Sequence, residues 1–467
     1  MEEYLMTING QGTRGIHNFK VINPATEEII AIVPECSDGQ LEMALDAATR
    51  SLTAWRQDVT KRRKALNACA EVLLSNVDSL AKLLTEEQGK PLRDSNREIR
   101  RSAELIKDFA KLEFPVEILQ DDESRRVELH RKPLGVVAAI TPWNVPIILA
   151  TLKFAPALLA GNTVVLKPSP FTPITTLKVG ELFQEVFPPG VFNTISGRDS
   201  VGAKLTLHPG IQKISFTGSV QAGKQVAVAG ARDLKRVTLE LGGNDPAIVL
   251  GDVDPKWVAE KLFEEAFWLC GQVCMTIKRV YVHESIYKTV VSELSSLATG
   301  TKLGNGMDPE TGMGPLNNKP QFERVIELVD DAKRSGAKMV TGGNPLSGRG
   351  YFFPPTIVTD ISDGVRLVDE EQFGPALPVM PFKDIDQVLE MANATNYGLG
   401  GSVWTKNIEL GQQLAARLDC GTAWVNQHGS VGMYAPFGGV KWSGFGYEFG
   451  KWGLDEYFQY QIINSVK

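Results

Sequence analysis

The chain has 467 residues, of which 43% are hydrophobic, and a formal net charge of −6 at pH 7. That length allows roughly two to four domains of about 100–200 residues each, and a mildly acidic chain without basic runs excludes a nucleic-acid-binding surface. The longest apolar run, residues 145–160, contains Lys153 and is too short for a membrane span. No signal peptide is apparent, and five thinly spread cysteines favour the reducing cytoplasm.

The first segment predicts a strand and turn at residues 19–24, followed by helices. Ser37 and Gln40 form a candidate capping box. The apolar positions of the helix that follows are Leu41, Ala44, Leu45, Ala48 and Leu52. Two further helices are predicted from about 61 to 84 and from about 94 to 112. Helices of this length on one side of the chain indicate a layer that covers a sheet.

Residues 125–132 form a polar, alternating ribbon that cannot bury much of itself within one subunit. We expect an arm that reaches a neighbouring subunit, the alternative being an ordinary exposed hairpin. The C-terminal stretch 457–463 also alternates, and a lone terminal strand is marginally stable. We therefore expect it to pair with the ribbon of a partner subunit, in a homo-oligomer that is either a dimer or a tetramer.

From Gly135 the pattern alternates between short apolar runs and helical stretches, which indicates a parallel, doubly wound α/β sheet. The expected strands are residues 136–140, 163–167, 191–195, 213–216 and 236–241. A second alternation follows Gly243, with strands expected at 247–250, 280–283, 338–340, 356–358, 402–404 and 422–425. Ligands of such sheets bind beyond the carboxyl ends of the strands. Polar residues lie at these ends in the first sheet, namely Asn144, Lys167, Thr217 to Ser219 and Glu240.

Cys274 lies between a helical run, 258–269, and a strand, 279–283. Free backbone N–H groups at such a boundary favour the thiolate and can hold an oxyanion. Glu240 ends an apolar run, where a carboxylate is costly to bury without a task. With the amide of Asn144, these residues can supply nucleophile, base and oxyanion donor.

Other interpretations of these residues remain open. A single cysteine is often only a small buried hydrophobe, and His283 or His428 could serve as the base of a cysteine hydrolase. Cys270 is interpreted as a pocket or packing residue. No metal site is expected, because neither the two nearby thiols nor the five histidines have metal-ligand spacing.

Seven motifs in order resemble the aldehyde dehydrogenase superfamily. They are TPWN (141–144), LKPSPFTP (166–173), FTGS (216–219) with Gly223, LELGG (239–243), GQVC (271–274), EEQFGP (370–375) and PFGGVKWSG (436–444). The resemblance implies NAD(P)-dependent, non-acylating oxidation of an aldehyde to a carboxylic acid through a thiohemiacetal and a thioester, with Cys274, Glu240 and Asn144 as catalytic residues. Alternatives are a CoA-acylating relative, against which Glu240 argues, and a non-catalytic binding protein on the same fold.

The resemblance also implies a Rossmann-type cofactor domain (1–115 and 134–242), an α/β catalytic domain (243–433) and a small β oligomerisation arm (116–133 and 451–467). The implied cofactor-binding residues are Thr141, Pro142, Trp143, Lys167, Ser169, Pro170, Thr217, Gly218, Ser219, Gly223, Leu241, Gly242, Glu371 and Phe373. The substrate pocket would include Val145, Trp268, Val431 and Met433. Pro170 stands where many NAD-preferring relatives carry a glutamate, so we expect NAD to be used and NADP to be tolerated.

Overall fold

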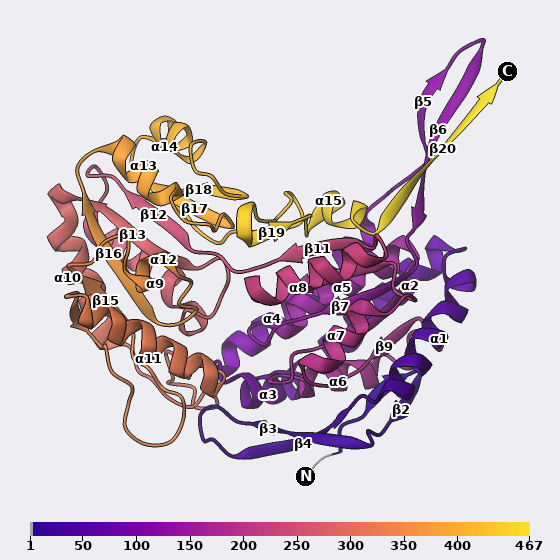
Figure 1. The fold of residues 1–467 in the computed structure, drawn as a ribbon, viewed down its shortest axis with the longest axis horizontal. Helices are drawn as coiled ribbons and strands as arrows, with labels where there is room; N and C mark the ends of the chain where they lie inside the picture. The colour runs from indigo at the N-terminus through magenta and orange to yellow at the C-terminus, as the bar shows by residue number, and fades with distance from the viewer. Residues whose placement is uncertain (1–2) are drawn as a thin grey trace.

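The computed structural model describes residues 3–467, and a largely parallel eight-stranded sheet forms its first half (Figure 1). The strand order is β19-β11-β10-β7-β8-β9-β1-β2. The strands are β1 Met6–Ile8, β2 Gln11–Thr13, β7 Val136–Ile140, β8 Thr163–Lys167, β9 Phe192–Thr194, β10 Lys213–Thr217, β11 Arg236–Glu240 and β19 Gly444–Phe445. Strands β7 to β11 pair in parallel wherever they are neighbours, as the alternating pattern predicts.

Helices cover both faces of this sheet, which is why its strands are continuous apolar runs. Val137 and Ala139 of β7 contribute to a core shared with helices α2 to α5, whereas Val136, Ala138 and Ile140 join the core on the opposite face. The helices are α1 Asp38–Trp55, α2 Val59–Ser75, α3 Val77–Gln88, α4 Leu92–Lys111, α5 Pro146–Ala160, α6 Ile174–Leu182, α7 Asp199–Leu207 and α8 Val220–Arg232.

The N-terminal helices confirm the predicted cap and correct one boundary. The Ser37 hydroxyl accepts from the Gln40 N–H while the Gln40 side chain accepts from the Ser37 N–H, so the capping box is formed. The helix predicted over 61–84 is wrong as a single element, because Asn76 leaves helical geometry at φ −116°, ψ 15° and separates α2 from α3. An antiparallel pair, β3 His17–Ile22 and β4 Ile29–Glu35, lies before α1.

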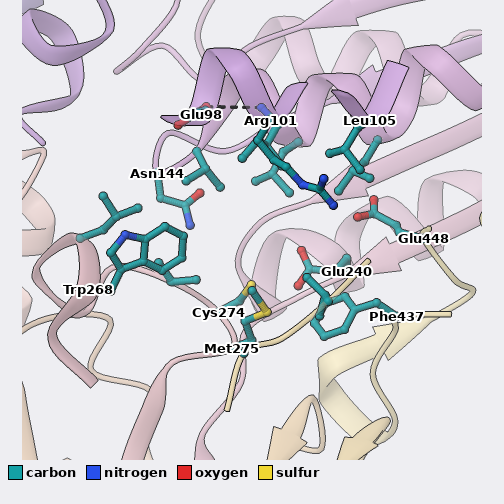
Figure 2. A pocket seen from close by; sticks show the side chains of 18 of the residues that line it. Glu98, Arg101, Leu105, Asn144, Glu240, Trp268, Cys274, Met275, Phe437 and Glu448 are labelled. Atoms are coloured by element: carbon teal, nitrogen blue, oxygen red, sulfur yellow. Dashed lines mark hydrogen bonds between the residues drawn. The ribbon is translucent and has the colours of Figure 1, made fainter. Parts of the chain in front are cut away.

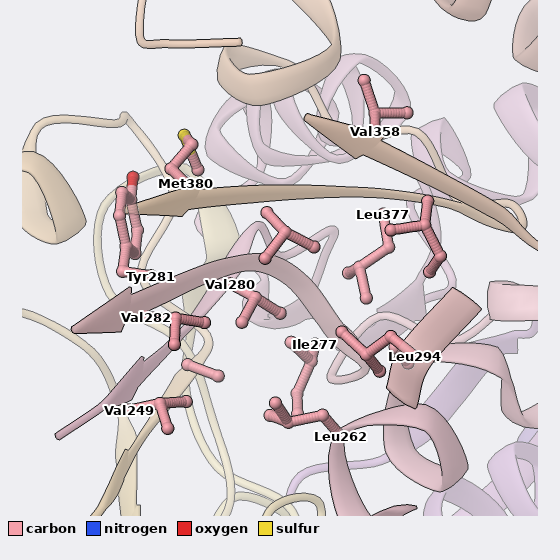
Figure 3. Packing of buried hydrophobic residues seen from close by; sticks show 14 of the residues in the cluster. Val249, Leu262, Ile277, Val280, Tyr281, Val282, Leu294, Val358, Leu377 and Met380 are labelled. Carbon is pink, nitrogen blue, oxygen red and sulfur yellow. The ribbon is translucent and has the colours of Figure 1, made fainter. Parts of the chain in front are cut away.

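The second half of the chain forms a seven-stranded sheet in the order β14-β15-β16-β13-β12-β17-β18. Its strands are β12 Asp245–Val249, β13 Ile277–His283, β14 Lys338–Thr341, β15 Thr356–Thr359, β16 Ala376–Phe382, β17 Gly400–Trp404 and β18 Thr422–Val425. Val249, Val280 and Leu377 share its core with the helices (Figure 3). The helical elements are α9 Pro255–Phe267, η1 Trp268–Gly271, α10 Glu284–Gly300, α11 Lys319–Arg334, α12 Arg366–Asp369, α13 Ile385–Asn393, α14 Ile408–Ala415, η2 Lys441–Ser443 and α15 Gly450–Asp455.

A three-stranded antiparallel arm projects from the body of the molecule (Figure 1). It consists of β5 Glu117–Asp121, β6 Arg125–Pro133 and the C-terminal β20 Phe458–Val466. The prediction that the C-terminal strand pairs with the ribbon of a partner subunit is wrong. Strand β20 pairs with β6 of the same chain over its whole length, from Phe458 opposite Pro133 to Val466 opposite Arg125. The helix α15 returns the chain to the base of β6, which makes this pairing possible within one subunit.

No helix within residues 3–467 combines the length and hydropathy that crossing a lipid bilayer requires.

Candidate active site

The polar residues predicted at the strand ends meet along one edge of the first sheet. Strands β11, β10, β7 and β8 are consecutive neighbours, so residues that follow them in the sequence are adjacent in space. The Thr141 N–H donates to the Lys167 carbonyl (3.2 Å), and the Gly218 N–H donates to the Glu240 carbonyl (3.2 Å). The parallel sheet therefore places the segments that carry Asn144, Lys167, Ser219 and Glu240 side by side.

A strained turn presents Cys274 to this edge. Leu269 and Cys270, in the 3₁₀ turn η1 after α9, have left-handed φ values of 50° and 60°. Such values are costly for non-glycine residues and persist only where the surroundings impose them. Gly271 also has a positive φ, 70°, and a Cβ there would lie 2.4 Å from the Gly374 carbonyl oxygen. The turn thus requires a glycine immediately before the loop of the cysteine.

The Gln272 side chain fixes the position of this loop. Its amide nitrogen donates to the Leu269 carbonyl (2.9 Å), and its amide oxygen accepts from the Asn317 N–H (2.8 Å). The backbone carbonyl of Gln272 accepts from the Asn144 side-chain amide at 2.9 Å. That bond orients Asn144 and leaves one hydrogen of its amide for a ligand, whereas its Oδ1 has no partner among the described residues.

Cys274, Glu240 and Asn144 face one cavity of about 230 Å³ (Figure 2). Its wall is largely apolar, with a charged side on α4. Among the residues predicted for a substrate pocket, Val145, Trp268 and Val431 line the cavity, while Met433 lies partly buried against the neighbouring core. The other lining residues are Lys90, Asp94, Arg97, Glu98, Arg101, Leu105, Ile148, Leu149, Leu152, Leu269, Val273, Met275, Gly429, Phe437, Glu448 and Phe449.

The cavity raises the pKa of both candidate catalytic groups. Burial, and then the negative charge of Glu448, raise the pKa of Glu240 to about 8. The Cys274 thiol interacts with the Glu240 carboxyl, which lowers the pKa of Glu240 but does not outweigh burial. The pKa of the Cys274 thiol lies well above its usual value, chiefly through burial and then through the negative charge of Glu240. The prediction that this position favours the thiolate is therefore wrong, because desolvation outweighs any nearby N–H groups.

Neither histidine considered as a hydrolase base is directed at Cys274. Buried His428 interacts through Nε2 with the Met275 carbonyl (2.9 Å) and through Nδ1 with the Ser402 hydroxyl (3.0 Å). His283 contacts Ser285 and caps α10. Both side chains thus have structural partners. Within residues 3–467 no group of three or more histidine, cysteine, aspartate or glutamate side chains could hold a metal ion.

A second set of predicted residues lies where the two sheets meet. The Trp143 and Phe373 rings are 5.3 Å apart and nearly perpendicular. Glu371 accepts from the Gly243 N–H (3.0 Å), and burial raises the pKa of Glu371 to about 7. A Cβ at Gly242 would lie 2.0 Å from a Glu371 oxygen, so a larger residue there would displace the Glu371 carboxyl.

The helix α8 begins directly after the predicted cofactor-binding residues Thr217 to Ser219. Ser219 is its N-cap and accepts from the Ala222 N–H (3.3 Å). The remaining N–H groups of the first turn have no intrahelical partner and favour an anion. A Cβ at Gly223 would lie 2.5 Å from Leu241, so this glycine lets helix and strand approach closely.

The remaining predicted cofactor residues surround this turn at the ends of β7, β8 and β10. Lys167 is buried; its ammonium donates to the Pro168 carbonyl (3.1 Å), and burial lowers its pKa to about 8. The Thr217 hydroxyl accepts from Lys153 (2.7 Å), and the Thr141 hydroxyl has no partner among the described residues. The Ser169 hydroxyl accepts from the Phe171 N–H (3.2 Å), and Pro142 and Pro170 are partly exposed beside it.

Several charged residues at the site were not predicted. Lys90 and Glu98 form a buried ion pair, and the Lys90 ammonium also donates to the Asn144 carbonyl (2.9 Å). Lys153 and Glu448 form a second buried pair at 2.8 Å. Lys153 had one signal in the sequence, a lone charge inside an apolar helix.

The fold and the site together define an α/β enzyme in which a cysteine, a glutamate and an amide share one cavity at the ligand-binding edge of a doubly wound sheet. A model of the aldehyde dehydrogenase family matches residues 12–463. Retinaldehyde dehydrogenase 3 from Rattus norvegicus is 38% identical over 455 residues, which cover 95% of this chain and 89% of the relative. Betaine aldehyde dehydrogenase, chloroplastic, from Beta vulgaris is 38% identical and covers 95% and 92%.

Solved structures agree with these relatives. The NAD⁺ complex of an aldehyde dehydrogenase from Bacillus cereus superposes with a TM-score of 0.97 at 36% identity, over 100% of this chain and 97% of that one. The chain therefore belongs to the aldehyde dehydrogenase family. It is an NAD(P)-dependent enzyme that oxidises aldehydes.

Proposed function

We propose that Cys274 is the nucleophile of a two-step oxidation of an aldehyde to a carboxylic acid. The Cys274 thiol loses its proton to solvent and the sulfur adds to the carbonyl carbon, forming a thiohemiacetal. Its oxyanion accepts hydrogen bonds from the free N–H of the Asn144 amide and from the Cys274 backbone N–H. Bound NAD supplies the acceptor for the hydride that leaves this carbon, and a thioester remains on Cys274.

Glu240 then acts as the base for hydrolysis. It takes a proton from a water molecule, the hydroxide adds to the thioester carbon, and the carboxylic acid leaves as the Cys274 sulfur is released. A pKa of about 8 suits a base that must both accept and return protons near neutral pH. The observation that carries this assignment is that Cys274, Glu240 and Asn144 face one cavity. A buried Glu240 at the cavity wall also favours water over CoA as the acyl acceptor.

The cofactor assignment rests on the residues at the sheet edge, whose chemistry fits the phosphates and the ribose groups of NAD. We propose that the N-terminus of α8, with Ser219, binds the pyrophosphate, that Lys167 and Ser169 lie near the adenosine ribose, and that Glu371 binds the nicotinamide ribose. The Thr141 hydroxyl, which has no partner among the described residues, is available to a ligand along this edge.

The same proposal divides the chain by role and assembly. The eight-stranded sheet and its helices form the cofactor-binding part, the seven-stranded sheet the catalytic part, and the three-stranded arm an oligomerisation element. Its exposed apolar residues include Ile118 (46% exposed), Leu119 (54%) and Ile462 (51%), which a homo-oligomer would cover. Five free cysteines suit the cytoplasm.

The two-step mechanism is tested by stopped-flow measurement of NADH. Glu240→Gln should release a burst of NADH close to one per active site and then stall, because the thioester forms but is not hydrolysed. Cys274→Ala should show no burst. An unchanged steady rate in Glu240→Gln would exclude Glu240 as the hydrolytic base, and a burst in Cys274→Ala would exclude the nucleophile.

A further inference from the structure

Lys278 is a buried cation under the loop of the nucleophile, and the steps above do not use it. It is the second residue of β13, and its side chain is 1% exposed. The ammonium donates to the carbonyls of Val273 and Cys274, both at 2.7 Å. A charge this deeply buried is costly unless it is paired, so its partners indicate what it does.

The other partners of Lys278 belong to the proposed cofactor site. Its ammonium lies 3.8 Å from a Glu371 carboxyl oxygen and 5.9 Å from the centre of the Phe373 ring. Glu371 is the residue proposed to bind the nicotinamide ribose, and Phe373 is among the residues expected to bind the cofactor. One cation therefore contacts both the peptide of the nucleophile and the carboxylate expected to bind the cofactor.

The charged side chains around the Cys274 thiol indicate what the Lys278 ammonium contributes to the site. Glu240, at the end of β11, and Glu371, after α12, both raise the thiol pKa, whereas Lys278 lowers it. Two other cations near the site are paired with carboxylates, Lys153 with Glu448 and Lys90 with Glu98, while Asp94, Arg97 and Arg101 of α4 line the same cavity. Lys278 is thus the cation that offsets two carboxylates around the sulfur.

We propose that Lys278 is a positioning residue that fixes the Cys274 peptide and stabilises the thiolate; this inference rests on the function proposed above. Lys278 also contacts Glu371. When Glu371 binds another group, its interaction with Lys278 changes, and so does the stabilisation that Lys278 gives to the Cys274 thiolate. The nucleophile and the nicotinamide end of the cofactor site are thereby coupled through one side chain.

The test is the rate of alkylation of Cys274 by iodoacetamide as a function of pH, followed by site-resolved mass spectrometry in the full-length protein without cofactor. Lys278→Met, a substitution of similar length, should move the pH midpoint up by about one unit, or about tenfold in rate at a fixed lower pH. Glu371→Gln should move the midpoint down, because the cation then loses its competing carboxylate.

Two results would overturn the proposal: an unchanged midpoint in Lys278→Met, or shifts of the same sign in both variants. Alkylation of Cys420, which is partly exposed, and thermal unfolding serve as controls for the integrity of the fold. If Lys278→Met does not fold, Lys278→Gln replaces it. Each variant is compared only where it keeps the native unfolding transition, because unfolding would expose Cys274 and would by itself lower the midpoint. Alkylation needs no turnover, so a failed burst experiment with Glu240→Gln would not mimic either outcome.

Discussion

At the scale of single residues, the burial of Glu240 links function to stability. A carboxyl with a pKa of about 8 in the folded protein binds more protons than it does unfolded, where its pKa is near 4.5. Stability contributed by this residue is therefore highest below about pH 4.5 and falls as the pH rises towards about 8. The burial of Glu240 therefore lowers the free energy of unfolding at high pH, where the carboxyl is ionised.

We expect Glu240→Gln to raise the thermal unfolding temperature by a few degrees at about pH 9 and by much less at about pH 5, because glutamine has no charge to bury. Differential scanning fluorimetry at both pH values measures this difference. An equal change at both pH values would show that packing, and not charge, distinguishes the two side chains.

The position of Pro170 bears on cofactor preference. Proline offers neither a carboxylate that repels the 2′-phosphate of NADP nor a donor that attracts it. We expect a preference for NAD smaller than about a hundredfold, or roughly 2.7 kcal/mol. Pro170→Glu should lose NADP-dependent activity selectively when kcat/KM is compared for the two cofactors. A native enzyme that already rejects NADP more than about a thousandfold would contradict this prediction.

The sequence allowed the residues that end strands to be predicted, but not their electrostatic environment. Glu240 ends one apolar run and Asn144 follows another. The β-α-β pattern predicts that both runs are strands of one parallel sheet. The protonation of Cys274 depends on desolvation and on Glu371, which is distant in sequence and reaches the site only through tertiary packing. Lys278 lies within an apolar strand, where sequence alone does not distinguish a buried cation from a solvated one.

At the scale of secondary structure, α5 is stabilised from its buried side by Lys153. The ammonium donates to Glu448 (2.8 Å) and to the Thr217 hydroxyl (2.7 Å), so it connects α5, the end of β10 and the segment before α15. Breaking a buried pair leaves the partner charge uncompensated, which costs about 3–5 kcal/mol. The helix depends on this pair even though its own sequence is strongly apolar.

We expect Lys153→Met to lower the unfolding temperature markedly, and the double variant Lys153→Met/Glu448→Gln to recover much of the loss. Thermal unfolding of the two single variants and the double variant forms a double-mutant cycle. Additive losses in the double variant would show that the two side chains act independently.

Three of the strands that were not predicted have features that hide them in the sequence. β16 lies between β15 and β13, yet its sequence, Ala376-Leu-Pro-Val-Met-Pro-Phe382, contains two prolines, which argue against an interior strand. β1 and β2 have three residues each, too few for a periodic signal. Long apolar runs such as those of β7 and β8 were predictable because both their faces are buried.

At the scale of the whole molecule, the arm exposes apolar side chains on a thin sheet. Ile462 on β20 lies opposite Leu129 on β6. We expect Ile462→Asp to shift the protein towards monomers in multi-angle light scattering, because a buried charge would disrupt the interface. Gln461→Asp, at the neighbouring exposed position, is the matched control. A native mass in Ile462→Asp would show that the arm does not hold the subunits together through this face.

The alternation of polar and apolar residues in the arm predicts strands, but it does not predict which strand pairs with which. The same pattern satisfies pairing within a chain and pairing across subunits, because hydrogen bonding of the ladder uses only the backbone. What decides between them is the length and direction of α15, which delivers the chain back to β6.

The pairing of β20 with β6 also sets the order in which this protein can be completed during synthesis. Arg131, in β6, bonds Asp455 at a position 324 residues further along the chain. Residues 455–466 must therefore be synthesised before the arm closes, and until then β6 has an unpaired edge. The Glu448 partner of Lys153 also arrives only at the end. An unpaired strand edge is a surface on which other chains can pair, so the stretch of synthesis between β6 and β20 is the one in which this fold has most need of protection from aggregation.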